Sequence, residues 1–331
     1  MHWFSQALKS RRAPAAMIAL LFALVSLGGQ AQLAPSADWT VPRTPAGHPD
    51  LQGIWSNAIL TPLERPAEFG DVAVLSEEEA LEYERRRVEQ NNMDRRAADN
   101  SADLGGAYND FWWDRGNSIA VTRQTSLVID PPDGQIPELT AAGKRRAEQR
   151  AERRRLHPAD GPEDRSLADR CINWPSAGPP MLPTAYNNNY QIVQTADHVL
   201  LVNEMVHETR VIPLAERPAL PDDLRQWLGR SQGRWEGDTL VVETTHFSDQ
   251  TYFRGASKDM HLTERFTRAA DDVLIYEFTV NDPAAFTRPW TARIPSIKAD
   301  GLIYEYACHE GNRSMTGILA GARAEERARG E

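Results

Sequence analysis

The chain has 331 residues, of which 41% are hydrophobic and 25% charged, with 22 Pro, 21 Gly and two Cys. This composition is typical of a globular protein and excludes collagen-like, low-complexity and wholly disordered classes. The formal net charge of −10 makes nucleic acid and anionic lipid poor partners for the chain as a whole. We expect no nucleic-acid partner, and a core that can be buried without depending on disulfides.

The N-terminus predicts a secretory signal peptide over residues 1–31. Basic residues from Lys9 to Arg12 precede an apolar stretch, Ala13 to Leu27, and small residues follow up to Ala31. The apolar stretch is shorter than the about 20 residues that span a bilayer, so an uncleaved anchor is the weaker alternative. Cleavage after Ala31 would remove three of the 37 basic residues and none of the 47 acidic ones, which changes the net charge from −10 to −13. We expect a secreted or periplasmic protein with no stable membrane insertion after cleavage.

Cys171 and Cys308 are the two cysteines of the chain. Two cysteines of one exported chain usually pair, which predicts a disulfide between them. Two unpaired buried thiols are the alternative. A catalytic thiol is not favoured, because no Cys-His-Asn pattern surrounds either residue.

The chain up to residue 170 is rich in loops and helices. Residues 32–49 contain many Pro and Ala and predict an extended arm. Within 50–170, a capping box of Ser76 and Glu79 begins a helix that ends near Gln90. Strands are expected over 119–123 and 126–130, and a second helix over 140–155. This second helix is very basic with almost no apolar stripe, which favours a solvated helix over a polyanion site.

Residues 171–319 predict an antiparallel barrel. A hairpin is expected around Ala196, with its second strand running from His198 towards Ile212, and a short helix over 221–228. The remaining strands are expected over 239–247, 261–267, 273–280, 290–294 and 302–308, followed by a flexible or helical tail over 320–331. Many short antiparallel strands without helices between them indicate a barrel or sandwich. The expected fold class is mainly β: an antiparallel β-barrel of the calycin or lipocalin kind with helical insertions and long loops.

The motifs of serine hydrolases, P-loop NTPases, nicotinamide enzymes and zincins are absent from the sequence, which argues against these classes. We expect no cofactor. The adjacent His-Glu pairs at 207–208 and 309–310 would point to opposite faces of an extended chain, which argues against a metal site.

Carboxylates in strand patterns are the first candidate functional feature. Residues two positions apart in a strand point to the same face. Four glutamates lie mid-strand between apolar residues of their own face: Glu204, Glu243, Glu264 and Glu305. A charge at a core-facing position is costly unless it is paired or lines a cavity. These glutamates line a ligand cavity, or they form structural ion pairs with Arg210, Arg265 or Arg293, or they lie on half-exposed faces whose apolar members are incidental.

A second candidate feature is the run Tyr186-Asn187-Asn188-Asn189-Tyr190, which leads into a strand. Its neutral donors and acceptors suit a polyol, sugar or carbonyl, although an Asn-rich turn is the alternative. Tryptophans add aromatic surface that could stack on a ring or simply fill the core: Trp112, Trp113, Trp174, Trp235 and Trp290.

Several stretches together resemble an uncharacterised family of secreted proteins of Gram-negative bacteria. They include MLPTAYNNNYQIVQ from Met181, GRWEGDTLVVETT from Gly233, and LTERF from Leu262. This resemblance implies no catalytic residues. Gly53-Ile54-Trp55 is also similar to the opening of a lipocalin barrel, although the long helical insertion after Trp55 departs from that family.

These features predict a secreted enzyme that acts on a small or oligomeric polar, possibly carbohydrate-derived, substrate by cofactor-independent acid–base chemistry of the lyase, hydratase or isomerase type. The candidate acid–base residues are His207, Glu264 and Tyr190. The candidate substrate-binding residues are Asn187, Asn189, Tyr186, Arg210, Arg265, Glu204 and Trp235. A lipocalin-like carrier of a hydrophobic or aromatic ligand is the alternative, and a structural protein of the cell envelope is a third. The oligomeric state is not predicted.

Overall fold

The computed structural model describes residues 39–94, 109–218, 220–251 and 253–330. The signal peptide predicted over 1–31 therefore lies outside the described residues. Within the arm predicted over 32–49, Arg43 and Pro49 form an antiparallel bridge around a turn, so this part of the arm doubles back on itself.

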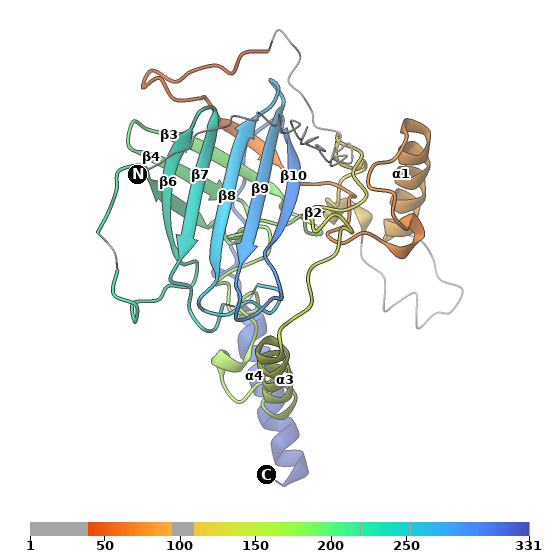
Figure 1. The fold of residues 1–331 in the computed structure, drawn as a ribbon. Helices are drawn as coiled ribbons and strands as arrows, with labels where there is room; N and C mark the ends of the chain where they lie inside the picture. Colours follow the sequence, from red (N-terminus) through yellow and green to blue (C-terminus); the bar gives the residue numbers. More distant parts are fainter. Residues whose placement is uncertain (1–38, 95–108, 219, 252, 331) are drawn as a thin grey trace, which may run out of the picture. The chain divides into compact units, whose positions relative to one another are not determined.

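The described strands form one antiparallel sheet that curls into a nearly closed barrel, as the sequence predicts (Figure 1). Their order around the barrel is β5-β4-β3-β1-β10-β9-β8-β7-β6, with β2 paired to β10. The strands are β1 (Gly53–Ser56), β2 (Val128–Asp130), β3 (Asn189–Gln194), β4 (His198–Asn203), β5 (Thr209–Pro213), β6 (Arg230–Glu236), β7 (Thr239–Thr245), β8 (His261–Arg268), β9 (Val273–Asn281) and β10 (Trp290–Lys298). Edge strands β5 and β6 are bridged by Gln232, whose Nε2 donates to the carbonyl of Pro213 at 2.8 Å.

Strand β1 joins the two halves of the barrel, because it pairs with both β3 and β10. Gly53 begins it with a φ of +141°, a conformation that side-chain-bearing residues rarely adopt. Trp55 is fully buried in the barrel, and its indole Nε1 donates to the carbonyl of Leu51 at 2.9 Å. The Gly-x-Trp element therefore bends the chain into the barrel and fills its interior.

The barrel interior is packed with aliphatic and aromatic side chains. Side chains alternate along β9: Leu274, Tyr276, Phe278 and Val280 are fully buried, whereas Glu277 between them is not. Burial of each such large side chain stabilises the fold by about 1.5–3 kcal/mol. Phe266 stacks on Tyr276, with ring centroids 4.8 Å apart.

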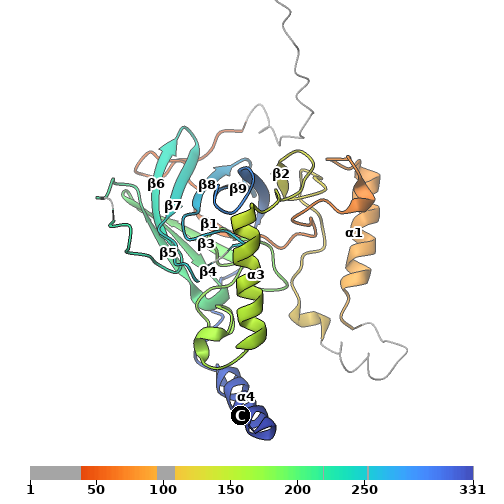
Figure 2. The ribbon, with the colours of Figure 1, turned by 60° about the horizontal axis from the view of Figure 1, so that its bottom comes forward.

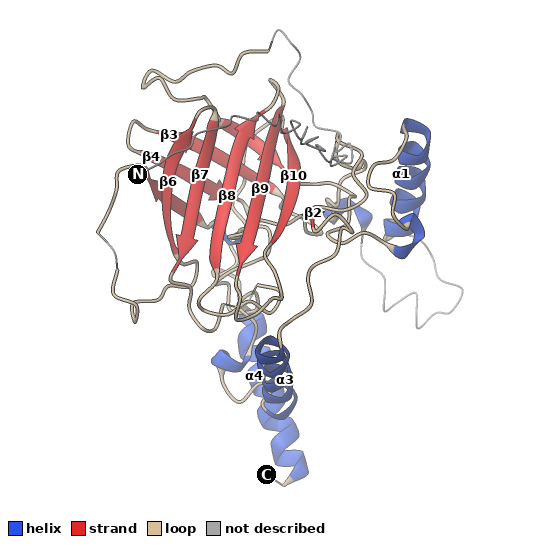
Figure 3. Ribbon diagram, viewed as in Figure 1, coloured by secondary structure: helices blue, strands red, loops and turns tan. Residues whose placement is uncertain are grey.

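Three α-helices lie within the described residues, outside the barrel wall (Figure 3). Helix α1 (Glu77–Asn91) has the predicted capping box of Ser76 and Glu79, and buries Tyr83. Helix α3 (Ala141–Leu156) corresponds to the second predicted helix. Thr140 caps it, and its one buried residue is Gly143. Helix α4 (Arg313–Arg329) includes most of the tail expected over 320–331. Short 3-10 turns are η1 (Ala67–Phe69), η2 (Asp110–Trp112), η3 (Pro162–Asp164) and η4 (Met205–His207).

Helices α3 and α4 both lie towards one end of the barrel (Figure 2). Arg323 of α4 donates to the carbonyls of Ala159 and Asp160 in the loop after α3. The predicted disulfide is confirmed, since Cys171 and Cys308 are bonded and tie the segment before α4 to this loop region. None of the described helices combines the length and apolarity that crossing a membrane requires.

Two expected strands are absent from the described structure, because side chains and turns take their backbone donors. Residues 119–123 form a turn in which Ile119 N–H donates to Glu84 and Ala120 N–H to Thr61. Residues 302–308 are also irregular, since two of their amides donate to Glu204 rather than to a strand.

Two further expectations for the barrel region are wrong. The helix expected over 221–228 is a set of turns, in which Gln226 exchanges backbone hydrogen bonds with the chain after β7. The strand that begins at His198 ends at Asn203, and the turn Glu204–Glu208 reverses the chain into the separate antiparallel strand β5.

Candidate functional site

Arg210 and Glu264 form an ion pair inside the barrel. Glu264 is fully buried on β8, and Arg210 reaches it from β5 with Nη2 2.5 Å from Oε2 and Nη1 3.2 Å from Oε1. The Tyr276 hydroxyl donates to Oε1 at 2.8 Å and accepts from the Met181 backbone amide at 3.0 Å. Burial and the Glu264 charge raise the pKa of Tyr276 well above its ordinary value. Glu264 therefore has the structural ion-pair partner that one of the three interpretations expected, Arg210.

Tyr190 is also inside the barrel, on β3. Its hydroxyl bonds to Ser296 Oγ at 2.9 Å, and Ser296 in turn donates to Asn57 Oδ1 at 2.5 Å. All three side chains are buried. Burial raises the pKa of Tyr190, so this phenol stays protonated and connects β3, β10 and the chain after β1.

The turn Glu204–Glu208 gathers several of the predicted polar residues at one end of the barrel. Glu204 is buried and accepts from Asn189 Nδ2 at 3.2 Å and from the Tyr304 amide at 3.3 Å. His207 is exposed there, with Nδ1 3.4 Å from Glu305 Oε1.

The backbone of this turn is strained. Val206 and His207 have φ values of +52° and +45°, which are rare for side-chain-bearing residues and unusual for a β-branched one. Burial raises the pKa of the Glu208 carboxyl, against the opposing charges of Arg210 and His207.

Tyr186 lies in an aromatic cluster beside the turn. Its ring centroid is 5.9 Å from that of Trp113, 6.2 Å from that of Trp174 and 6.2 Å from that of Tyr306. The cluster packs on buried Met205 and Val206. Asn187 follows Tyr186 with a φ of +52°, so it turns the chain into β3. Asn188 is buried and bonded to Asp114 and Thr184, as an Asn-rich turn requires.

The other predicted site residues lie away from this end turn. Arg265 pairs with Glu236 at 2.9 Å, and both side chains are partly exposed. Trp235 stacks on His48, with ring centroids 5.3 Å apart. Glu243, partly exposed, bonds to His261 and to Arg234.

The structure therefore brings together one group of predicted residues and separates the others. Tyr186, Asn187, Asn189, Glu204 and His207 lie on or beside the end turn. Glu264, Arg210 and Tyr190 belong to buried networks, so the three proposed acid–base groups do not converge. The four glutamates do not converge on one cavity.

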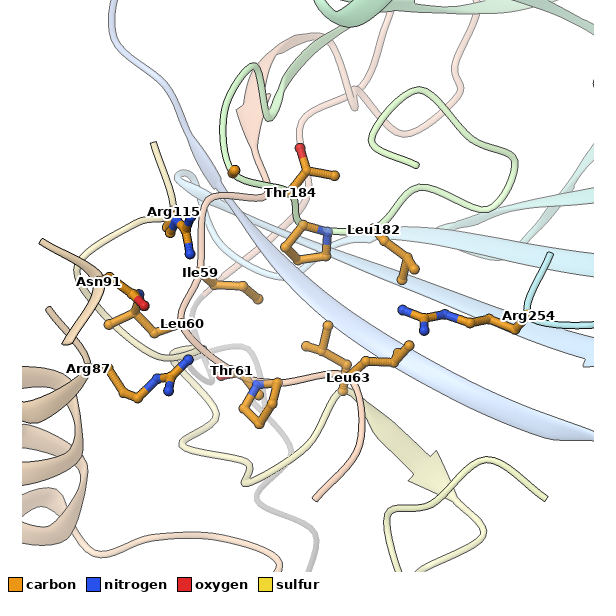
Figure 4. Close-up of a pocket in the computed structure, with 14 residues that line it drawn as sticks. Ile59, Leu60, Thr61, Leu63, Arg87, Asn91, Arg115, Leu182, Thr184 and Arg254 are labelled. Carbon is orange, nitrogen blue, oxygen red and sulfur yellow. The ribbon is translucent and has the colours of Figure 1, made fainter. Parts of the chain in front are cut away.

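A cavity lined by arginines, which the sequence did not predict, lies where α1 and four loops meet. This first cavity has a volume of about 350 Å³. Arg87 and Arg115 lie on one side and Arg254 reaches in from the other (Figure 4). Between them the wall is apolar, with Ile59, Leu60, Leu63, Leu127 and Leu182. No carboxylate is among its described lining residues.

None of the three arginines forms an ion pair with a described residue. The Arg115 guanidinium lies 4.3 Å from the centroid of the Trp113 ring, and Arg115 forms no ion pair with a described residue. Arg254 forms neither an ion pair nor a hydrogen bond with any described residue, and its φ of +53° is rare for a non-glycine residue. Arg87 donates from Nη1 to the neutral side chain of Gln90 at 3.2 Å.

A second cavity of about 280 Å³ adjoins the first and shares Leu182 and Arg254 with it. Its wall is mostly apolar, with Trp174, Phe253 and the prolines 175, 179 and 180, together with the amides of Asn173 and Gln250. Phe253 is fixed by stacking on buried Trp290, with centroids 5.9 Å apart. The two cavities therefore join a cationic compartment to an apolar one.

Only fragments of this site were visible in the sequence. The aromatic residues Trp113, which contacts Arg115, and Trp174, which lines the second cavity, were candidates for stacking. The arginines come from three distant segments, and no local pattern indicates that they converge.

Comparisons with known proteins gave no match: no family model, curated protein or solved structure is similar to this chain.

Proposed function

We propose that the protein binds a small organic anion, with the acidic group of the ligand between Arg115 and Arg254 in the first cavity. The observation that carries this proposal is that three arginines line one cavity with no carboxylate among its described lining residues, in a chain of net charge −10. Like charges that face one cavity repel each other, and an anionic ligand would replace this repulsion by attraction. The volume of about 350 Å³ lies within the range of small-molecule sites.

The chemistry of arginine supports a carboxylate as the acidic group. A planar guanidinium can donate two parallel hydrogen bonds to a carboxylate, and such charge-assisted bonds contribute about 1.5–3 kcal/mol each. The contact of Arg115 with Trp113 restrains its guanidinium, which reduces the entropy lost on binding. Two such contacts would support a dissociation constant in the millimolar to micromolar range, about 4–8 kcal/mol.

The second cavity would take the body of the ligand. Its aromatic and proline surfaces suit the flat or apolar side of a ring, and Asn173 and Gln250 can bond to hydroxyl groups. A sugar acid or a carboxylated aromatic compound has this combination of groups. The disulfide supports an oxidising compartment as the place where the protein meets such a ligand.

An acid–base enzyme of the lyase or isomerase type is the second candidate, and the end turn supports it. The positive φ values of Val206 and His207 place strain beside the Glu208 carboxyl, whose pKa is raised. Strained backbone and perturbed carboxyl groups are found together at catalytic sites. Binding is better supported than catalysis, because no carboxylate, imidazole, thiol or phenol lines the described parts of the first two cavities.

The proposal is tested by thermal denaturation with matched pairs of ligands. Galacturonate should raise the melting temperature, and neutral galactose, which lacks only the carboxylate, should not. Arg254→Gln should abolish the shift, whereas Arg265→Gln, outside the cavity, should keep it. A shift that is equal for both sugars, or that survives Arg254→Gln, would show that these arginines are not the binding site.

A further inference from the structure

A third cavity extends from the second. It has a volume of about 450 Å³, lies between the basic face of α3 and the loop over 163–170, and shares Leu167 and Gln250 with the second cavity. The first and second cavities share Leu182 and Arg254. The three cavities therefore follow one another, with the apolar one in the middle.

The far cavity has an excess of cationic groups. Arginines 150, 153, 154, 165 and 170 line it together with His157, against Glu163, Asp164 and Asp249. Asp164 is already engaged by Arg153 at 2.7 Å and by the Gly161 amide at 3.1 Å, and these bonds lower its pKa. The Arg170 guanidinium lies 5.4 Å from the centroid of the Trp227 ring, which leaves its hydrogen-bonding edge for a ligand.

This arrangement explains the composition of α3. A solvated helix would alternate charges of both signs, whereas 141–156 contains seven Arg and Lys residues against two Glu. One face of that helix lines the third cavity, through Arg150, Arg153 and Arg154. Part of the positive charge of α3 therefore lines the third cavity instead of facing solvent.

We propose that the three cavities form one groove for a linear acidic oligosaccharide, an oligouronide. One uronate unit would place its carboxylate at Arg115 and Arg254, and a later unit would place its own at Arg154 and Arg170. Between them, Trp174 and Phe253 would contact sugar rings, and Asn173 and Gln250 would bond to hydroxyls. This inference rests on the proposed function of the first cavity and adds the repeating, multiply charged nature of the ligand.

The chemistry of the middle compartment favours a sugar chain over other dianions. A long aliphatic dicarboxylate would have no use for Asn173, Thr251 and Gln250. An acidic peptide, which an arginine cluster can also bind, does not present a row of sugar rings to Trp174 and Phe253. Both compounds serve as outcomes of the test.

Calorimetric titration with galacturonate and with its oligomers of two to six units tests the inference. Affinity should rise by about tenfold or more at the length that reaches the third cavity, since a new charge-assisted contact forms there. Arg154→Gln/Arg170→Gln should remove this gain and leave binding of the monomer unchanged. Arg145→Gln, on the same helix but exposed and outside the cavity, is the matched control and should keep the gain.

The possible failures are distinguishable. If the monomer does not bind wild-type protein, the proposed function fails. If the monomer binds but length brings no gain, or the double variant keeps the gain, the groove is wrong while the first site stands. A neutral oligomer with reduced carboxyl groups that binds equally well, or tighter binding of a dicarboxylate or an acidic peptide, would also overturn the inference.

Discussion

Arg210 and Glu264 lie side by side in the barrel interior, joined by N–O contacts of 2.5 and 3.2 Å. Because Arg210 is on β5 and Glu264 on β8, the pair connects strands that are not neighbours in the sheet order. The pair therefore fixes the position of β5 relative to β8. The Glu264 carboxylate already has hydrogen-bond partners, in Arg210 and Tyr276.

Breaking this pair should strongly destabilise the protein. Arg210→Met leaves Glu264 buried without a cation, which should cost about 3–5 kcal/mol of unfolding free energy. The double variant Arg210→Met/Glu264→Leu should be more stable than either single variant, because no charge is left buried. Urea unfolding measures all three. Arg265→Gln, which removes a partly exposed pair, should cost at most about 1 kcal/mol, and an equal cost for Arg210→Met would contradict this account.

The fold and this buried carboxylate were predictable, because alternation along a strand is a local signal. Parity put Glu264 on the same strand face as its apolar neighbours Leu262 and Phe266, and all three are fully buried. Alternation along a strand did not predict the position of Glu204, because β4 ends at Asn203 and the chain turns there. Nothing in the local sequence indicates that Val206 adopts the positive φ of this turn.

The arginine cavity could not be predicted, because long-range packing assembles it. Arg87 is placed by burial of Tyr83 on α1, and Arg115 by the hydrogen bond from the Asp114 amide to the Ala185 carbonyl. Arg254 comes from the loop between β7 and β8.

The position of Arg115 should depend on the glycine that follows it. Gly116 has a φ of +73°, and a Cβ there would lie 2.2 Å from the carbonyl oxygen of Ala58. Gly116→Ala should therefore cost about 1–3 kcal/mol of unfolding free energy and weaken uronate binding. Gly237→Ala is the matched control, because its φ is +60° with no atom near the added Cβ. Equal costs in the two variants would show that the close approach to Ala58 does not matter.

The carboxyl of Glu208 should make stability depend on pH. Burial raises its pKa above the ordinary value of 4.5, so the folded state favours the protonated form. Its contribution is full below the unfolded-state pKa and is lost as the pH rises through the folded-state pKa. The unfolding free energy of wild type minus that of Glu208→Gln should therefore fall as the pH rises above about 4.5. A difference that stays constant or rises over this range would contradict the assignment.

The disulfide should contribute to global stability and hold the segment before α4. Cys171 and Cys308 are 137 residues apart, and closing so long a loop stabilises by roughly 4–5 kcal/mol in chain-entropy models. The Cys171→Ala/Cys308→Ala variant should lose up to this amount, and its amide exchange should accelerate over 302–329 more than in β8 and β9. Adding a reductant should not lower the unfolding free energy of this variant further. Unchanged exchange over 302–329 would show that other contacts hold the segment.

The account is tested most directly by a crystal structure of the protein with bound galacturonate. It predicts that the carboxylate lies between the guanidinium groups of Arg115 and Arg254, with the sugar ring towards Trp174 and Phe253. Galacturonate bound instead at the Glu204–Glu208 turn, or anywhere that leaves both arginines uncontacted, would contradict it.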